Sequence, residues 1–266
     1  MRVDQAMRQA KSSIHEQIAA LGPWFHNLHL PDGSQTSPGH PFGDFPSFKW
    51  RHLARAVPED LSGWSVLDIG CNGGFYSFEL ARRGARVMGV DVEPLYLRQA
   101  CWAARQFGLD GQIEFIEGDV YRLLNSRQSF DLVWFTGVFY HLRYPTLALD
   151  LVRRATSRLM MFQSMTMPGE SHQPMPEDLP LHGREAMLSE VWPKMAFVEH
   201  RVAGDDSNWW VPNAMCVEAM LRSAGFTVIA RPEHEFYLCR PVPIPPASRR
   251  DLDNLQALLS DRAAGL

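Results

Sequence analysis

The sequence predicts an α/β fold with a central, mostly parallel sheet of seven strands and an antiparallel edge. Two observations support this prediction. Short apolar runs alternate with longer stretches of helical periodicity, which is the order of repeated βαβ units. The first two runs also enclose a glycine-rich turn and end at an acidic residue, Asp91, as in a nucleoside-binding unit.

The first predicted strand covers residues 65–69, a short apolar run typical of a parallel strand that is buried on both faces. Gly70, Gly73 and Gly74 follow it. These glycines allow the backbone to take positive φ, and they let a ligand approach without meeting a Cβ atom. We therefore expect a ligand-binding turn directly after this strand.

A helix over residues 75–83 and a second strand over residues 85–90 follow the turn. Gly84 lies between them and is a natural helix C-cap. The second strand leads to Asp91, whose carboxylate is expected to bind the two hydroxyl groups of a ribose.

The glycine spacing argues against a dinucleotide cofactor. The G-x-G-x-x-G pattern holds a pyrophosphate on a helix N-terminus, but Asn72 and Phe75 occupy its second and third glycine places here. Asp68, just before the turn, suits a positively charged ligand, and S-adenosylmethionine carries a sulfonium and an ammonium group. The chain resembles the class I methyltransferases, whose first motif is hydrophobic-hydrophobic-D/E-x-G-x-G-x-G, although Gly73 stands beside the usual second glycine. This resemblance implies a Rossmann-like fold, with S-adenosyl-L-methionine as the cofactor.

The next predicted elements are a helix over residues 93–107 and strands over residues 113–120 and 130–135. Asp119 ends the first of these strands and is expected to meet the adenine amino group, although a simple turn also accounts for an aspartate there. Ligands of open α/β sheets bind at the carboxyl ends of the strands. We therefore expect the loop over residues 136–141 to face the transferable methyl group.

Three domain regions are expected along the chain. Residues 1–60 form an N-terminal cover, residues 61–240 the methyltransferase core, and residues 241–266 a Pro-rich tail with a helix. A proline-rich stretch, residues 166–208, is predicted to be a lid insertion within the core, because it lacks the pattern of a βα unit. The remaining expected elements are helices over residues 3–21, 145–156, 217–224 and 248–262, and strands over residues 159–164, 226–230 and 235–239.

Composition limits the classes of function. The chain has 266 residues, 45% of them hydrophobic, and a net charge of −4, which does not favour a protein that grips a nucleic-acid backbone. Its four cysteines form no C-x-x-C pair, so neither a zinc knuckle nor a disulfide framework is expected. The charged first dozen residues do not resemble a signal peptide, and no run is long enough for a membrane span, so we expect a cytoplasmic protein.

A closer resemblance involves three motifs: Phe48-Lys-Trp-Arg51, Gly137-Val-Phe-Tyr-His141 and Trp210-Val-Pro-Asn213. Together they resemble the group that contains the tRNA wobble-uridine carboxymethyltransferase, over residues 24–239. The resemblance implies cofactor contacts by a lysine, a glycine, an acid and a tyrosine at matching positions. The two resemblances and the strand ends give this expected cofactor set: Phe45, Lys49, Asp68, Gly70, Asn72, Gly73, Asp91, Val92, Glu93, Asp119, Val120, Thr136 and Tyr140.

The departures from this group concern charge. The tRNA enzyme uses a carboxylated form of S-adenosylmethionine, whose extra carboxylate meets a lysine and an arginine. Here residues 26–30 contain neither lysine nor arginine, and residues 233–237 read Glu-His-Glu-Phe-Tyr. A buried carboxylate without a partner is costly, so ordinary S-adenosylmethionine is expected.

His141 and Tyr140 are the predicted catalytic residues, because their loop is expected to face the methyl group. His141 is the candidate base for an acceptor hydroxyl, and a structural histidine is the alternative. The expected substrate-binding residues are His26, His29, Trp210 and Asn213. The H-x-x-H spacing of the two histidines lacks a nearby carboxylate set, so no metal is expected.

Three functions therefore compete. The first is methylation of a small-molecule acceptor, with a hydroxyl as the expected target. The second is methylation or carboxymethylation of the wobble uridine of tRNA. The third is a non-catalytic protein that binds S-adenosylmethionine, and the complete set of cofactor residues argues against it. No membrane partner is expected, and nothing in the sequence indicates the oligomeric state.

Overall fold

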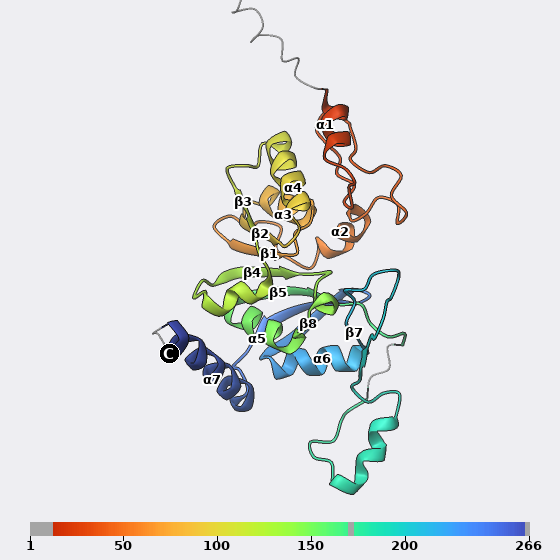
Figure 1. Cartoon of the computed structure of the whole chain (residues 1–266), viewed down its shortest axis with the longest axis vertical. Coiled ribbons are helices and arrows are strands. Elements are labelled where there is room, and N and C mark those ends of the chain that lie inside the picture. The colour runs from red at the N-terminus through yellow and green to blue at the C-terminus, as the bar shows by residue number, and fades with distance from the viewer. Residues whose placement is uncertain (1–12, 170–172, 264–266) are drawn as a thin grey trace, which may run out of the picture.

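The computed structural model describes residues 13–169 and 173–263. Its centre, within these residues, is a seven-stranded sheet with the order β3-β2-β1-β4-β5-β9-β8 (Figure 1). The strands are β1 (Ser65–Ile69), β2 (Arg86–Asp91), β3 (Ile113–Glu117), β4 (Phe130–Phe135), β5 (Thr156–Gln163), β8 (Phe226–Glu233) and β9 (Phe236–Pro241). Strands β1 to β5 pair in parallel, whereas β9 is antiparallel to both β5 and β8. The predicted mostly parallel sheet of seven strands is confirmed, and its antiparallel strand lies one place in from the edge.

Helices cover both faces of this sheet. The helices are α1 (Ile14–Ala20), α2 (Ser47–Leu53), α3 (Phe75–Arg82), α4 (Pro94–Phe107), α5 (Pro145–Ala155), α6 (Ala214–Ser223) and α7 (Pro246–Ala263). Helices α3 and α4 belong to one apolar cluster and α5 and α6 to the other. Along β4, Leu132 and Trp134 enter the first cluster while Val133 and Phe135 enter the second. Because a strand turns alternate side chains to opposite faces, this unbroken apolar run marks a strand buried on both sides.

Several strand ends differ from the prediction, and two of them, in β3 and β5, have a clear local cause. Strand β3 ends at Glu117, because Asp119 instead caps the short 3₁₀ helix η1 (Val120–Asn125). Strand β5 begins at Thr156, directly after α5, without an intervening loop. Thr156 has a β-branched side chain, and its hydroxyl donates a hydrogen bond to the carbonyl of Val152, 2.7 Å away. This bond closes the last turn of α5.

The N-terminal cover contains one helix that was predicted and one that was not. The predicted helix over residues 3–21 is described only from α1, where Ser13 and Glu16 form a capping box. Residues 1–12 lie outside the described part. Helix α2 escaped the prediction because it has no side-chain N-cap and begins after Pro46 within an aromatic-rich stretch.

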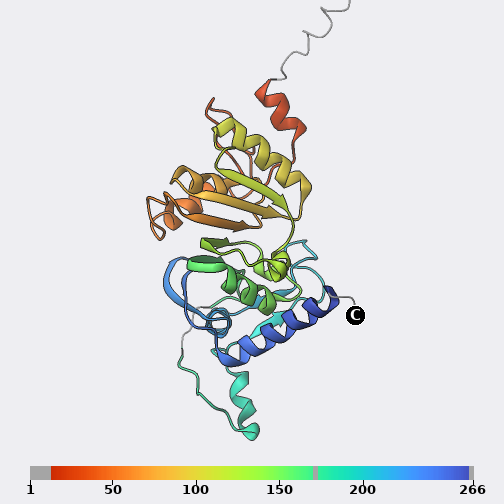
Figure 2. The same ribbon diagram turned by 90° about the vertical axis from the view of Figure 1, so that its left-hand side faces the viewer.

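The lid insertion holds more regular structure than its sequence pattern indicated. It contains the 3₁₀ helix η3 (Leu181–Leu188) and strand β6 (Met195–Phe197), which pairs with β7 (Trp210–Pro212). Figures 1 and 2 show η3 in teal, apart from the sheet. Figure 2 also shows α7 on the side of the sheet opposite α1.

Candidate cofactor and active site

The glycine turn after β1 depends on backbone shapes that only some residues adopt. Gly70 has φ +71°, and a Cβ there would overlap Cγ2 of Val138. The loop after β4 therefore packs directly on this turn. Asn72 also has positive φ, at 50°, a region that asparagine tolerates better than most residues. This explains why asparagine occurs where the family motif has glycine.

Asp91 holds the glycine turn in place. Its carboxylate accepts hydrogen bonds from the backbone N–H groups of Asn72 at 2.8 Å and Glu93 at 2.9 Å. Only 7% of the residue is exposed, and this burial raises the pKa of its carboxyl. Because a carboxylate offers roughly four acceptor positions, these bonds leave capacity for hydroxyl donors from a ligand.

Four other predicted cofactor residues beside the turn lie in different settings. Asp68 is buried and accepts a hydrogen bond from the hydroxyl of Ser77 at 2.6 Å, and burial raises its pKa to about 7. Val92 is exposed, whereas Val120 is buried in the core. Glu93 caps α4 through the N–H of Leu95. Asp68 is thus engaged with α3, while Val92 and Glu93 are exposed directly after β2.

Asp119 and Thr136 complete the predicted positions at the strand ends. The carboxylate of Asp119 accepts a hydrogen bond from the N–H of Tyr121 at 2.9 Å, which begins η1. Asp119 remains exposed, so its side chain is accessible from solvent. Thr136 directly follows β4 and is half-buried. Both residues stand at the carboxyl ends of parallel strands, where ligands of such sheets bind.

His26 connects the N-terminal cover to the glycine turn. It is 5% exposed and packs against the rings of Phe45, Phe75 and Tyr76. Its Nδ1 lies 3.8 Å from the place a Cβ would take on Gly73. Burial lowers the pKa of this imidazole to about 3, so the ring is neutral at pH 7.

Two buried polar atoms around Gly73 have no hydrogen-bond partner among the described residues. They are Nδ1 of His26 and Oε1 of Gln99, and both lie within 4 Å of the Cβ position of Gly73. Buried polar groups are almost always paired, with protein or with water or ligand. The unpaired atoms beside Gly73 and the free acceptor positions of Asp91 fit a polar ligand such as S-adenosylmethionine.

Lys49 lies between the cover and the β8–β9 hairpin. Its Nζ is 5.5 Å from the ring centroid of Phe45 and 5.3 Å from that of Phe236. Burial lowers the pKa of this amine, while the carboxylates of Glu235 and Glu233 act in the opposite direction. The lysine thus faces both aromatic rings and acidic groups.

Glu235 ties three loops together, and sequence reasoning did not find it. It has φ +66° at the hairpin turn, and its carboxylate accepts hydrogen bonds from the Thr166 hydroxyl at 3.0 Å and the Gln163 amide at 3.2 Å. The amide oxygen of Gln163 in turn accepts from the N–H of Gly137 at 2.8 Å. This chain of bonds connects the hairpin to the loop that carries Tyr140. A glutamate with positive φ is uncommon, but the sequence alone does not report φ.

Tyr140 and His141 lie side by side in η2 (Phe139–His141), with ring centroids 4.3 Å apart. Burial, together with the charges of Glu235 and Asp205, raises the pKa of Tyr140 to about 12. Burial lowers the pKa of His141, and the nearby Asp205 carboxylate partly offsets this. At pH 7 the tyrosine is therefore a neutral phenol and the histidine is mostly a neutral base.

The other predicted substrate residues lie away from the glycine turn or are engaged elsewhere. His29 is exposed and pairs with Asp44 at 2.7 Å. Trp210 packs against Phe197 with ring centroids 5.0 Å apart. The side chain of Asn213 caps α6 and donates to the carbonyl of Trp192 at 2.8 Å, so its amide is used within the protein.

Neither a metal cluster nor a membrane helix is found in the part of the chain that the structure describes. Among residues 13–169 and 173–263, no three His, Cys, Asp or Glu side chains are grouped to hold a metal ion. His26 points into the aromatic cluster, whereas His29 pairs with Asp44. The same residues include no helix long and apolar enough to span a bilayer.

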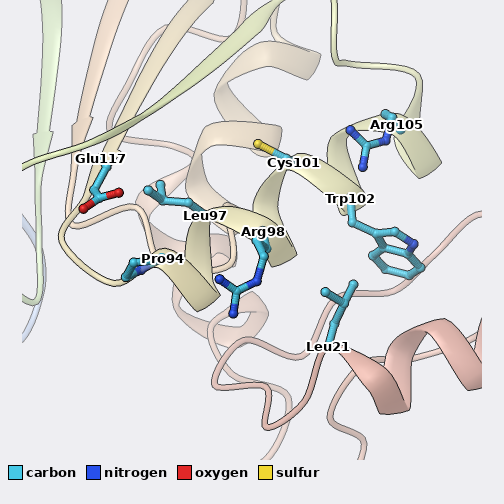
Figure 3. Close-up of a pocket in the computed structure, with 8 residues that line it drawn as sticks. All are labelled: Leu21, Pro94, Leu97, Arg98, Cys101, Trp102, Arg105 and Glu117. Carbon is cyan, nitrogen blue, oxygen red and sulfur yellow. The ribbon is translucent and has the colours of Figure 1, made fainter.

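A groove of about 490 Å³ runs along α4 (Figure 3). Figure 3 shows Arg98 and Arg105 extending from α4, and Trp102 beside Leu21. None of its lining residues comes from the glycine turn or from residues 136–141. The groove is therefore distinct from the site at the carboxyl ends of β1 and β4.

The comparison with protein families gives the class of this site. Residues 66–158, which run from β1 into β5, match a family model described as a methyltransferase domain. The chain contains a class I, S-adenosylmethionine-dependent methyltransferase domain. The expected fold, class of enzyme and cofactor are therefore confirmed for this domain.

Sequence relatives of the methyltransferase agree with the predicted resemblance. The tRNA U34 carboxymethyltransferase of Cellvibrio japonicus (strain Ueda107) is 25% identical over 229 residues, which cover 84% of this chain and 61% of the relative. The protein of that name from Colwellia psychrerythraea (strain 34H / ATCC BAA-681) is 30% identical over 210 residues, which cover 77% of this chain and 54% of the relative. The chain thus spans roughly three fifths of the length of the relatives it matches.

Solved structures agree on the fold of the methyltransferase. The N-terminal domain of EvdMO1, solved in the presence of SAH and D-fucose, has a TM-score of 0.59 and 20% identity, covering 86% of this chain and 95% of that one. An S-adenosylmethionine-dependent methyltransferase structure from Listeria monocytogenes has a TM-score of 0.51 and 12% identity. The match covers 74% of this chain and 99% of that one. At these identities the likeness shows the fold.

Proposed function

We propose that this methyltransferase transfers the methyl group of S-adenosylmethionine to a hydroxyl group of a small molecule. The observation that carries the proposal is the position of His141. This neutral, 31% exposed base follows β4, in a loop that packs on the glycine turn at Gly70. A hydroxyl acceptor requires such a base, because its proton must leave as the new bond forms.

Several residues of this chain would hold the cofactor. Asp91 would accept hydrogen bonds from the ribose hydroxyls, beyond those it already accepts from the backbone. The glycine turn would allow close approach, and the unpaired Nδ1 of His26 would meet a polar group near Gly73. When bound, S-adenosylmethionine supplies an electrophilic methyl group on a sulfonium.

Besides binding the cofactor, the protein would position the acceptor and remove the proton of its hydroxyl group. His141 would take the hydroxyl proton at its Nε2, because its Nδ1 is engaged with Ser207. Tyr140, a neutral phenol beside it, would help to align the reacting groups. The ring of Phe45 packs against His26 beside the glycine turn and would shield this part of the site from water.

The structural likeness to the EvdMO1 domain, solved with D-fucose, supports a sugar-like acceptor. The test is a comparison of metabolites from cells with and without the gene, grown on methyl-labelled methionine. A labelled, hydroxyl-derived methyl ether that disappears with the gene is the expected result. Labelled nitrogen or carbon methyl groups would contradict the proposed O-methylation, and purified protein that methylates no extract fraction would favour the non-catalytic alternative.

Modification of tRNA is the second candidate function, and the names of the sequence relatives favour it. The charge of the chain opposes it, because acidic residues outnumber Lys and Arg by 30 to 26. The charges of Glu233 and Glu235 in the β8–β9 hairpin also act on Lys49, so an additional cofactor carboxylate beside this lysine would be repelled by two negative groups. Ordinary S-adenosylmethionine therefore fits the proposed reaction better than its carboxylated form.

A further inference from the structure

The lid insertion brings an acid and a hydroxyl to His141. Nδ1 of His141 lies 2.9 Å from the hydroxyl oxygen of Ser207. This oxygen lies 2.6 Å from Oδ1 of Asp205, which also accepts the N–H of Ser207 at 2.7 Å. The other carboxylate oxygen of Asp205 is 3.8 Å from the same histidine nitrogen. Ser207 thus stands between a carboxylate and an imidazole.

The protons of this group can be assigned from donor and acceptor capacity. The Asp205 carboxylate has no proton to give, so the hydroxyl of Ser207 donates to it. The Ser207 oxygen is then left as an acceptor toward His141, and Nδ1 of His141 must carry a hydrogen. A neutral imidazole has one N–H, so Nε2 keeps a free lone pair.

The backbone of the insertion is attached to the same loop that carries His141. The N–H of Trp209 donates to the carbonyl of Tyr140 at 2.8 Å. The guanidinium of Arg143 lies over the Trp209 ring, 4.6 Å from its centroid. Trp209 makes both contacts and lies two residues after Ser207, so they keep the end of the insertion beside the loop of His141.

A tight turn gives Asp205 its position. Ala203 and Gly204 both have positive φ, and Val202 pairs with Asp205 across them. The side-chain amide of Asn208, which is 5% exposed, donates to the carbonyl of Val202 at 2.9 Å. The carboxylate is therefore set by local backbone structure and does not depend on its contact with the histidine.

We propose that Asp205 and Ser207 are positioning residues that hold His141 as its Nδ1–H tautomer and direct Nε2 toward the methyl acceptor. The role of Nε2 as a base rests on the proposed function, whereas the tautomer does not. In the reaction, the hydroxyl proton of the acceptor would move to Nε2 while its oxygen bonds to the methyl carbon. The bond between that carbon and the sulfonium sulfur would break at the same time, and its electron pair would stay on the sulfur as a neutral thioether. The resulting imidazolium would be stabilised by the Asp205 carboxylate through Ser207.

The tautomer can be measured without knowing the acceptor. Two-bond ¹H–¹⁵N correlation spectra of the full chain with ¹⁵N-labelled histidine distinguish the two tautomers, and the signal that is lost in His141→Gln identifies His141 among the 10 histidines. We expect the Nδ1–H form in the wild type, a shift toward Nε2–H in Ser207→Ala, and recovery in Ser207→Thr, which keeps the hydroxyl. Asp206→Asn is the matched control, because this neighbouring, 77% exposed acid contacts Arg201 instead.

The outcomes separate this inference from the proposed function. An Nε2–H tautomer in the wild type, or no change in Ser207→Ala when circular dichroism shows a folded protein, overturns the inference. The expected tautomer in a protein that methylates no hydroxyl contradicts the proposed function alone. With an acceptor in hand, Ser207→Ala should lower kcat by about 10-fold or more with little change in KM for S-adenosylmethionine, because groups that orient a catalytic histidine affect the chemical step.

Discussion

At the scale of single residues, Asp91 braces the glycine turn, and we propose that it also binds the cofactor. Its carboxylate fixes the N–H groups of Asn72 and Glu93, and a ribose would use the acceptor positions that remain. Asp91→Ala removes both functions. The site therefore loses a ligand contact and also the brace of the turn that the ligand approaches.

We expect Asp91→Ala to weaken binding of S-adenosylmethionine by about 2–4 kcal/mol, the contribution of two hydrogen bonds to a charged group. Titration calorimetry of wild type and variant measures this difference. The matched control is Asp110→Asn, an exposed acid in the turn between α4 and β3, which should bind normally. Equal affinity of Asp91→Ala and wild type would remove Asp91 from the site.

His141 gives a second prediction at this scale, which concerns pH. Burial lowers the pKa of its imidazole from the ordinary value of 6.5, while Asp205 acts in the opposite direction. The base is thus neutral and active above its pKa and is protonated as the pH falls through it. We expect kcat/KM of the wild type to decline only below about pH 6.5. Replacement of the base should have a larger effect: we expect His141→Ala to lower kcat by on the order of 10²- to 10⁴-fold. A variant with wild-type turnover across pH 5 to 9 would leave His141 with a structural role.

At the scale of elements, the β1–α3 turn requires glycine at one position more strictly than at others. Gly70→Ala forces a Cβ into Val138 and a positive φ onto alanine. We expect a loss of about 1–3 kcal/mol in the free energy of unfolding from the backbone strain alone, with a further loss from displacement of the loop after β4. Urea unfolding measures it, with Gly111→Ala as control, because nothing lies within 4 Å of a Cβ there. A variant as stable as the control would show that the loop moves aside at little cost.

The lid insertion gives a prediction for hydrogen exchange. Its ends are attached: β6 pairs with β7, and the N–H of Met167 donates to the carbonyl of Pro212 at 2.8 Å. Helix η3 has no buried residue, and Leu181 and Leu188 are 76% and 78% exposed. We expect fast exchange over residues 181–188 and slower exchange over β6 in the free protein, with η3 gaining protection only when cofactor and acceptor are both bound. Slow exchange over η3 in the ligand-free protein is the contrary result.

Sequence patterns predicted those parts of the site that depend on neighbouring residues. Apolar runs mark the ends of strands well. Three features come at or directly after such ends and could be predicted in this way: the glycine turn, Asp91 and the loop of His141. Ser207 meets His141 across 66 positions, and Glu235 meets Thr166 across 69. No local pattern encodes such pairs, so His141 was predicted as a candidate base without the contact it makes with Ser207.

Some predicted assignments met a competing local use of the same side chain. Asn213 was assigned to substrate, yet asparagine is also a preferred N-cap, and the structure uses it to cap α6. Asp119 likewise caps η1, although it stays exposed at its strand end. Capping requires only a residue type at a helix start, so sequence alone does not separate it from ligand binding.

At the scale of the whole molecule, charge distinguishes the two enzymatic functions. The chain carries 26 basic and 30 acidic residues, and nucleic-acid binding depends on phosphate contacts that raise affinity at low salt. We therefore expect no retention of bulk tRNA in filter binding at low salt, under conditions that retain tRNA on a known tRNA-binding protein. Methyl transfer to a small-molecule extract should be unchanged when tRNA is added. Retention of tRNA that weakens steeply as salt rises, together with labelling of tRNA by methyl-labelled S-adenosylmethionine, would favour tRNA modification and overturn the small-molecule proposal.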